Sequence, residues 1–564
     1  MDERAAGSKH GWRRATRLLP IGLLLIGLAS YLRDLGGLAP REERIPLAPL
    51  VVSPDLKTAD SLPATPGALR GHDVVLVTLD TTRPDRLGCY GNSQSTTPNI
   101  DRLAREGVIF SAAVATATTT LPTHASILTG LYPQHHGARA NSHYRLDDEQ
   151  RTLAEILSDA GYATGAFVSA FVLDQRFGLA QGFGSYDDQV GSKAGLTGFA
   201  ERKADQTTDR AIDWLRRQGS GPYFLWVHYY DPHSLHDPPA PYKETHALPY
   251  DGEIAFVDHE LGRLLQAVDS AGSREALVVL VADHGEAFGE HGELTHGHLV
   301  QEATLRIPLI MRATGGLGRG VHVDTRVSQV DLMPTILSLV GIEEPRDLDG
   351  VSLLQAPDRG RTLLAEAVDA EFGWARLVAA YRGSLKYVDG PNPELYDLAR
   401  DPLERDDVVA DRAADAATMR RILREQEGPD AGRLGASSVE LGAEDIARLE
   451  AIGYVAGGGV AAVDGAPGAD PKAMLPALGE MQRLLANYDS SPRLPGWRRF
   501  AARLQGNTLI DSRAELIRQL EQLASDHPDF APVHQHLARF YEEEQRPADA
   551  AAATQRFDAM TRRD

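Results

Sequence analysis

Side chains that bind metals or carry protons follow three apolar runs of the sequence. Asp80 follows VVLVTL, Asp231 follows YFLWVHYY, and the pair Asp283 and His284 follows LVVLVA. Nine of the 19 histidines fall between residues 228 and 298. Because metal ligands and catalytic groups are commonly supplied by several strand ends, this enrichment predicts a metal site.

The segment TTTLPTHASILTG, residues 118–130, supplies a candidate nucleophile. Pro122 suits a first helical turn and Gly130 a helix end, which places Thr120 at a helix N-terminus. The exposed N–H groups and the positive end of the dipole there favour a bound anion and a developing alkoxide. These threonines could equally serve only as helix caps, and the local sequence does not separate the two interpretations.

The elements that position these residues alternate between strands and helices from Gly71 onward. Continuous apolar runs suit a parallel sheet buried on both faces, and they occur at residues 74–79, 223–230, 277–282 and 307–311. Helical patterns lie between them, for example at residues 148–160 and 203–217. The predicted fold class is therefore α/β, with a mostly parallel sheet and helices on both faces. Ligands in such folds bind beyond the carboxyl ends of the strands.

Composition divides the chain into six segments. We expect a signal or anchor segment (1–36), a Pro-rich linker (37–70), the main α/β domain (71–355), a small α+β subdomain (356–456), a Gly/Ala linker (457–472) and a helical tail (473–564). Within the tail, residues 526–557 have apolar residues at tetratricopeptide-like offsets. An ordinary helical hairpin fits this stretch equally well, and the tail could bind a protein partner.

Charge and cysteine content exclude several functions. The 564 residues include 79 acidic and 58 basic side chains, a net charge of −21, which disfavours binding to nucleic acid. One cysteine excludes a disulfide framework and a cysteine zinc finger. Basic residues precede the uncharged run 18–32, which predicts export. The segment is either one N-terminal membrane helix facing the periplasm or exterior, or a cleaved signal.

Seven motifs, in order over residues 72–410, resemble the sulfatase family of the alkaline phosphatase superfamily. They are Asp80 with LGCYG, TPNID (97–101), LPTHAS with LTGLYP (121–133), DHGE (283–286) with His296, VDLMPTI (330–336), DGVSL (349–353) and ELYDL (394–398). The resemblance implies an alkaline-phosphatase-like sheet followed by a small C-terminal subdomain, and it implies ester hydrolysis. It does not extend to the helical tail.

Departures from the family pattern point to a different nucleophile. Sulfatases carry a C/S-x-P-x-R motif whose first residue becomes formylglycine, whereas Thr120 and His124 occupy its Cys/Ser and Arg positions here. Thr81 replaces a second Asp after Asp80, and His284 stands where many sulfatases have Asn. Imidazole favours Zn²⁺ or Mn²⁺ over Ca²⁺. The chain therefore resembles the Thr-nucleophile branches, which implies one divalent metal held by Asp80, Thr120, Asp283 and His284.

The resemblance also implies partners for the substrate oxygens. We expect Thr120, His228 and His296 to be catalytic, and His124, Arg83 and His233 to bind the substrate. A second metal, held by Asp231, His236 and His296, is the alternative arrangement.

The expected function is an exported, metal-dependent hydrolase of a phosphate (di)ester, phosphonate or sulfate ester. Its substrate would be an anionic small molecule, glycan or lipid head group. Two alternatives stay open: a transferase that passes a phospho-substituent to a lipid or glycan, and a non-catalytic scaffold.

Overall fold

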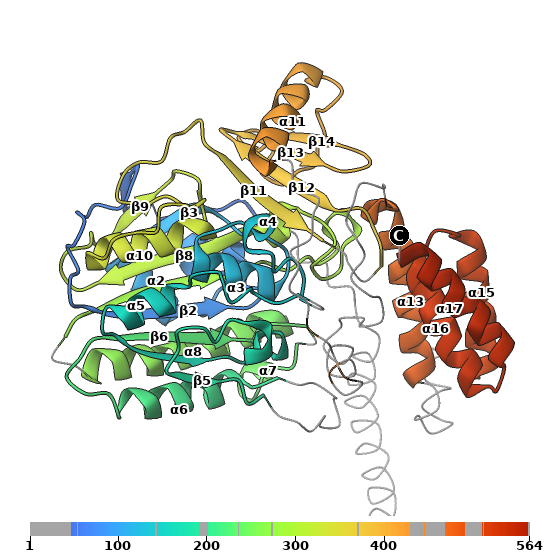
Figure 1. Cartoon of the computed structure of the whole chain (residues 1–564), viewed down its shortest axis with the longest axis horizontal. Helices are drawn as coiled ribbons and strands as arrows, with labels where there is room; N and C mark the ends of the chain where they lie inside the picture. The colour runs from blue at the N-terminus through green and yellow to red at the C-terminus, as the bar shows by residue number, and fades with distance from the viewer. Residues whose placement is uncertain are drawn as a thin grey trace, which may run out of the picture.

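The computed structural model describes residues 47–561, with gaps (Figure 1). The gaps are residue 54, 142–143, 191–200, 235, 272–273, 369–371, 429–467 apart from 439, 442 and 445, 491–509, and 511. The expected signal or anchor segment, residues 1–36, lies outside the described residues, as does most of the linker 457–472. Within the described part of the chain, no helix combines the length and apolar character needed to cross a membrane.

A ten-stranded sheet organises the main domain. Its order is β1-β9-β3-β8-β7-β2-β6-β4-β5, and β10 pairs with β3. The three strands that carry the site are β2 (Asp73–Leu79), β6 (Tyr223–Tyr229) and β7 (Ala276–Ala282), parallel neighbours in which every residue is buried. The others are β1 (Lys57–Ala59), β3 (Val108–Val114), β4 (Ala163–Phe167), β5 (Ser185–Asp187), β8 (Arg306–Ala313), β9 (Val321–Val323) and β10 (Val327–Ser328). Continuous Val and Leu runs form these central strands because both of their faces meet the core.

The structure confirms the predicted fold class but corrects two details. The run at residues 307–311 forms part of β8, which is antiparallel to β3 and β7. Burial on both faces, which an apolar run reports, does not fix strand direction. The expected linker 37–70 is also not a free linker over its second half. Residues 57–59 pair with β9, and Leu62 and Leu69 are buried in the core.

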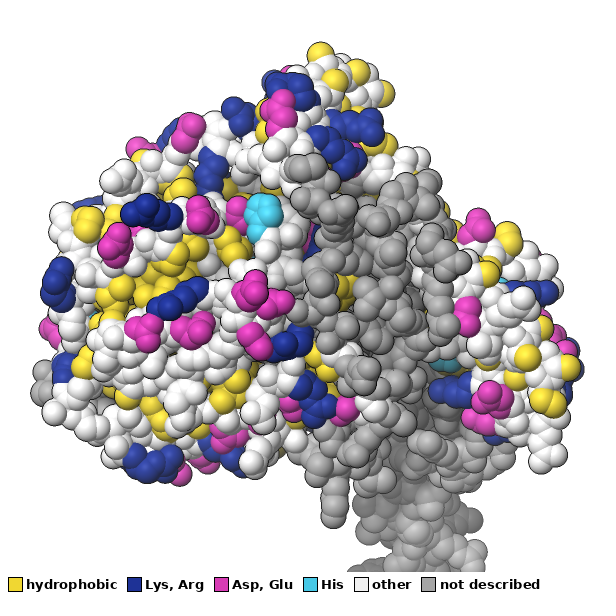
Figure 2. Space-filling model, viewed as in Figure 1, with side chains coloured by type: hydrophobic (Ala, Val, Ile, Leu, Met, Phe, Trp, Pro, Cys, Tyr) yellow, Lys and Arg dark blue, Asp and Glu magenta, His cyan; other side chains and the backbone are white. Residues whose placement is uncertain are grey.

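Helices pack against the sheet in two groups. One group joins α2 (Pro98–Glu106), α6 (Ala204–Leu215) and α8 (Pro249–Ala271), and the other joins α3 (Thr120–Thr129), α5 (Leu153–Asp159) and α10 (Leu332–Val340). The shorter helices are α4 (Pro133–His136), α7 (Tyr242–Thr245) and α9 (Glu302–Leu305). Acidic and basic side chains are interspersed over the face drawn in Figure 2.

The rest of the chain forms a small subdomain and a helical tail. The subdomain is an antiparallel sheet of β11 (Thr362–Ala367), β12 (Leu377–Arg382), β13 (Leu385–Asp389) and β14 (Glu394–Asp397), with α11 (Ala413–Glu427). The tail contains α13 (Pro471–Ser490), α15 (Arg513–Asp526), α16 (Ala531–Glu543) and α17 (Pro547–Thr561), gathered beside the main domain in Figure 1. The α16–α17 pair coincides with the tetratricopeptide-like stretch.

Candidate active site

Two neighbouring strands place Asp80 and Asp283 side by side. The last residues of β2 and β7, Leu79 and Ala282, are paired in register, and each Asp comes directly after its strand. The Asp283 N–H donates to the Leu79 carbonyl at 3.1 Å, which continues the pairing past the strand end. The carboxyl ends of parallel strands thus bring both acids to the same edge of the sheet.

His284 lies between these acids and Thr120. Its Nε2 is 3.4 Å from Asp283 Oδ2, 3.8 Å from Asp80 Oδ1 and 3.5 Å from Thr120 Oγ1. Thr120 is the first residue of α3, as the sequence predicts. The four residues expected to hold a metal are therefore brought together, and the ligand atoms of the two Asp residues and His284 lie within 4.8 Å of one another.

Backbone groups aim the ligand atoms toward the centre of this group. The His284 ring carries its proton on Nδ1, which donates to the Gly285 carbonyl at 3.0 Å, and Nε2 is left with a lone pair. Asp283 Oδ1 accepts from the N–H groups of Thr81 (3.1 Å) and His284 (2.7 Å), which leaves Oδ2 for a ligand. Gln329 Nε2 donates to the Asp283 carbonyl at 2.6 Å and holds the strand end in place.

Three of the four carboxylate oxygens of Asp80 and Asp283 are buried without a hydrogen-bond partner. They are both oxygens of Asp80 and Oδ2 of Asp283. Burial raises the pKa of Asp80 to about 7, and burial together with the Asp80 charge raises the pKa of Asp283. Leaving two such groups unsatisfied is costly unless a cation lies between them. The residues present therefore fit a divalent metal ion.

His228 presents a proton donor rather than a ligand atom. Its Nδ1 accepts from the Ser169 N–H at 3.3 Å, so the neutral ring carries its proton on Nε2, 3.3 Å from Asp80 Oδ2. Burial lowers the pKa of His228 to about 4, which keeps the ring neutral. We call Asp80, Thr120, Asp283 and His284 the metal-ligand group. A donor beside this group suits contact with a substrate oxygen, and His228 therefore stays a candidate for that contact.

The expectation that His124 binds substrate is wrong. Its Nδ1 donates to the Thr120 carbonyl at 2.7 Å, and its Nε2 accepts from the Thr78 hydroxyl at 3.0 Å. Thr78 in turn accepts from Trp226 Nε1 at 3.0 Å. With both nitrogens engaged and the ring buried, His124 instead fixes the first turn of α3.

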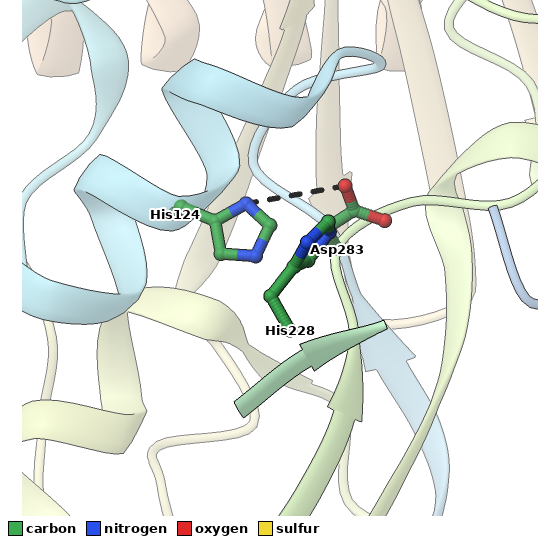
Figure 3. Close-up of side chains that lie close together, drawn as sticks. All are labelled: His124, His228 and Asp283. Atoms are coloured by element: carbon green, nitrogen blue, oxygen red, sulfur yellow. Dashed lines mark ion pairs between the residues drawn. The ribbon is translucent and has the colours of Figure 1, made fainter. Parts of the chain in front are cut away.

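His124, His228 and Asp283 also lie close enough to suggest an ion site (Figure 3). Figure 3 shows the two rings converging on the carboxylate, with His124 Nδ1 4.0 Å from Asp283 Oδ2. This group has no free imidazole lone pair, since His124 uses both nitrogens and His228 Nε2 carries a proton. Asp80, Asp283 and His284 are therefore the better candidates to hold an ion.

The expectation that Arg83 neutralises substrate is also wrong. Its guanidinium donates to both oxygens of Asp85, at 2.9 and 2.8 Å, and to Glu290 Oε1 at 3.0 Å. The side chain is fully buried. Arg83 therefore links the segment after β2 to the loop after β7. This role is structural, and it depends on a partner that is distant in the sequence.

The three residues proposed for a second metal do not form a site. Asp231 accepts from Lys203 Nζ and from the Ala204 N–H, both at 2.9 Å, which uses both of its oxygens. His236 Nδ1 pairs with Glu253 Oε2 at 3.1 Å. Among the described residues, these side chains are not part of any group placed to share an ion. The arrangement with one metal is the one that the geometry favours.

His296 and His233 are buried close to His284. The His296 ring is 4.4 Å from the His284 ring and 5.0 Å from that of His233. His233 donates from Nδ1 to the Ser234 carbonyl at 2.7 Å, and its buried Nε2 has no partner. Both rings thus lie near His284, and their contact with a substrate stays a prediction.

Glu286 and Asn141 are site residues to which sequence reasoning gave no role. Glu286 Oε1 contacts His296 Nδ1 at 2.9 Å, and burial raises the pKa of Glu286 to about 8 while lowering that of His296 to about 4. The sequence feature that could have indicated Glu286 is the presence of an acidic residue two positions after His284. Asn141 Oδ1 accepts from the Leu121 N–H at 2.7 Å, and its Nδ2 is buried without a partner. No motif marks Asn141.

A cavity of about 710 Å³ lies elsewhere, between α11 and β13. Its basic residues are already paired: Arg424 with Asp389 at 2.7 Å and Arg421 with Glu425 at 2.7 Å. It contains none of the residues of the metal-ligand group, so the chemistry is assigned to the strand ends.

Known proteins share this chain's sequence pattern and fold. Residues 72–342 match the model of the Sulfatase family. The uncharacterized sulfatase YidJ of Escherichia coli K12 is 27% identical over 421 residues, covering 61% of this chain and 84% of YidJ. An arylsulfatase of Clostridium perfringens is 24% identical over 459 residues, covering 64% and 95%. The phosphonate monoester hydrolase of Agrobacterium radiobacter has the same fold, with a TM-score of 0.53 at 22% identity over 66% of this chain and 100% of that one. Residues 72–342, just under half of the chain, thus form a domain of the Sulfatase family, and the protein is a sulfatase-like ester hydrolase.

Proposed function

We propose that this protein hydrolyses a monoanionic phosphorus ester, either a phosphodiester or a phosphonate monoester, with Thr120 as the nucleophile. The observation that carries the proposal is the position of Thr120 Oγ1, 3.5 Å from His284 Nε2 and beside two unsatisfied buried carboxylates. A divalent ion held by Asp80, Thr120, Asp283 and His284 would lower the pKa of the Thr120 hydroxyl and allow attack at neutral pH. The imidazole ligand favours Zn²⁺ or Mn²⁺ over Ca²⁺.

The reaction consists of two displacements. In the first, Thr120 Oγ1 releases its proton to solvent and bonds to phosphorus while the bond to the leaving alcohol breaks. In the second, water attacks the same phosphorus, the bond from phosphorus to Thr120 breaks, and Thr120 takes a proton back from solvent. His228 Nε2 is placed to donate to a non-bridging oxygen of the substrate.

The pair His296 and Glu286 supplies the proton for the leaving alcohol. At neutral pH the Glu286 carboxyl, whose pKa burial raises to about 8, holds a proton and donates it to His296 Nδ1. The neutral ring then carries its own proton on Nε2, on the side of His284. When His296 Nε2 donates its proton to the departing oxygen, the Glu286 proton moves onto His296 Nδ1. In the second displacement the attacking water gives a proton to Nε2, and the proton on Nδ1 returns to Glu286.

Local charge favours a monoanionic substrate. The basic side chains of Arg83 and Lys203 are held by carboxylates, at 2.8 and 2.9 Å, and burial keeps His228 and His296 neutral. One dication between two aspartates leaves little positive charge for the second negative charge of a phosphate monoester. A sulfate ester has the right charge, but a sulfated threonine lacks the elimination route of a formylglycine hydrate. This is why phosphorus is proposed.

The proposal includes export. The basic residues and apolar run within residues 1–36 support delivery of the domain across a membrane, with anchorage or cleavage of that segment as the two routes.

Paired aryl esters test the proposed reaction. Aryl phosphodiester, phosphonate monoester, phosphate monoester and sulfate are assayed with enzyme reconstituted with Mn²⁺, Zn²⁺ or Ca²⁺. We expect the diester and the phosphonate to be cleaved fastest, with kcat/KM at least about tenfold above the phosphate monoester and the sulfate, and with Mn²⁺ or Zn²⁺ more active than Ca²⁺. A sulfate preference with Ca²⁺ would overturn the proposal.

A further inference from the structure

The helical tail packs against the loop that carries His296. We propose that the tail is part of the catalytic unit: by holding this loop, residues 286–299, it fixes His296 for catalysis. The inference rests on the role given to His296 in the proposed function. It assigns positioning roles to Trp374, which lies between two of the family motifs, and to Phe530 in the tail.

Hydrogen bonds within the loop connect its parts, so that a displacement of one part also displaces the others. Glu293 Oε1 accepts from the N–H groups of His298 (2.8 Å) and Leu299 (3.3 Å), and the Ala287 N–H donates to the Thr295 carbonyl at 2.7 Å. His298 is two residues from His296, whose ring faces His284. Fixing the His298 side chain therefore fixes the backbone that presents His296.

A cluster of rings, which we call the aromatic junction, joins this loop to the tail. The His298 ring lies 5.9 Å from Phe372, nearly parallel to it, and 5.2 Å from Trp374. Phe372 and Trp374 are 5.0 Å apart, and Trp374 lies 6.3 Å from Phe530, at the start of α16. Phe530 is fully buried and the two middle rings are 6% exposed. Ring contacts at these distances stabilise by about 0.5–1.5 kcal/mol each.

The backbone of the junction is also enclosed by the tail. Gly373 has φ +65°, and a Cβ there would lie 2.6 Å from the carbonyl oxygen of Met560, at the end of α17. The Ala375 N–H donates to the Ala469 carbonyl at 2.9 Å, just before α13. In addition, α13 packs against the short 3₁₀ turn Glu290–Gly292 of the His296 loop itself. Three parts of the tail region thus meet the junction or the loop.

The tail lies outside the part of the chain that matches the family model. That match ends at residue 342, and Thr120 and the proposed metal ligands all precede that point. The tail therefore acts on the site through His296 and not through the metal-ligand group. Displacing the tail should lower kcat and leave metal content unchanged.

Two glycines offer a matched test in the full-length enzyme. Both Gly373 and Gly383 have positive φ, +65° and +58°, but a Cβ on Gly383 meets nothing within 4 Å. Gly373→Ala and Gly383→Ala thus impose similar backbone strain, and only the first pushes on the tail. We expect Gly373→Ala to lower kcat on an aryl phosphodiester at least about tenfold, with metal content and KM nearly unchanged. Its His298 and Leu299 amides should exchange hydrogen at least about tenfold faster. In Gly383→Ala, both quantities should stay within about twofold of the wild type.

A second pair covers the case in which Gly373→Ala does not fold. Phe530→Leu removes the ring that meets Trp374, whereas Phe540→Leu, in the same helix, removes a ring that meets Tyr488. The same two readouts should change only for Phe530→Leu. Unchanged amide exchange or unchanged kcat in the junction variants overturns the inference. The exchange result does not depend on which ester is cleaved, and an active Thr120→Ala enzyme would separately overturn the proposed function.

Discussion

His284 Nε2 lies 3.5 Å from Thr120 Oγ1, although the two residues are 164 positions apart in the sequence. The first turn of α3 and the end of β7 meet at this point. The helix contributes the hydroxyl, and the strand contributes an imidazole whose other nitrogen is fixed by the Gly285 carbonyl. The same strand end brings the unsatisfied carboxylate of Asp283. The proposed nucleophile and the proposed metal ligands thus lie together in one buried position.

Replacing Thr120 should remove turnover and leave the fold and the metal in place. We expect Thr120→Ala to lower kcat by at least about 10³-fold, because the attacking oxygen is lost. Metal content should stay near that of the wild type, because Asp80, Asp283 and His284 still bind the ion. Thr120→Ser, which keeps a hydroxyl, should restore part of the activity. Thr129→Ala at the other end of α3 is the matched control, since its hydroxyl makes only local contacts among the described residues: it donates to the Ala125 carbonyl at 2.7 Å and accepts from the Leu131 N–H at 3.3 Å. Wild-type kcat in Thr120→Ala excludes Thr120 as the nucleophile.

Metal binding should depend on the unsatisfied carboxylates. We expect Asp80→Asn or Asp283→Asn to lower metal affinity by at least about 100-fold, measured by titration calorimetry and elemental analysis. Asp251→Asn is the control, because that carboxylate is partly exposed and pairs with Arg86 at 2.9 Å. Equal metal content in all three variants would place the ion elsewhere. Calcium as the only metal recovered would contradict the assignment of an imidazole ligand.

The metal-free enzyme should lose stability as pH rises. Burial raises the pKa of Asp80 from 3.8 to about 7, so the folded protein holds a proton that the unfolded chain has already released in this range. The contribution of Asp80 to the free energy of unfolding should therefore fall by up to about 1.4 kcal/mol per pH unit between pH 4 and pH 7, and level off above. Urea unfolding with a chelator at pH 5 and pH 7 measures this. Asp80→Asn lacks the titration, so the difference between variant and wild type should grow in favour of the variant. An equal difference at both pH values contradicts the expectation.

Two arginines three residues apart should differ in their effect on stability. Arg83 is fully buried between Asp85 and Glu290, whereas Arg86 pairs with Asp251 at a partly exposed position. We expect Arg83→Met to cost about 3–5 kcal/mol of unfolding free energy, because the buried Asp85 loses its partner. Arg86→Met should cost less than about 1 kcal/mol. Chemical denaturation measures both. A larger KM in Arg83→Met with unchanged stability would contradict the structural role and support substrate binding by Arg83.

Local features of the sequence predict where these residues lie, and the family resemblance implies that they form a metal-ligand group. Asp80 and Asp283 each follow an apolar run, and parallel strands place such ends at one edge of the sheet. The helix signals around Pro122 place Thr120 at a helix N-terminus but do not give its role. Strand directions, and the partners of residues that are distant in the sequence, cannot be predicted from such local features. The sequence of β8 does not reveal that the strand is antiparallel, because the strand is buried on both faces.

The errors at single residues have the same origin. Arg83 is engaged by Glu290, which lies 207 positions away, and Asp231 by Lys203, which lies 28 positions away. His124 is occupied by Thr78 on a neighbouring strand. In each case the residue type suits catalysis, and a tertiary partner decides its role. The contact between Trp374 and Phe530 likewise depends on how two separate units pack.

Stereochemistry at phosphorus tests the covalent intermediate most directly. The substrate is an aryl thiophosphate diester of defined configuration, hydrolysed in ¹⁸O-labelled water, and the configuration of the product is determined. Each in-line displacement inverts phosphorus, so attack by Thr120 followed by attack by water gives net retention. Net inversion, the result of a single attack by water, would contradict the assignment of Thr120 as the nucleophile.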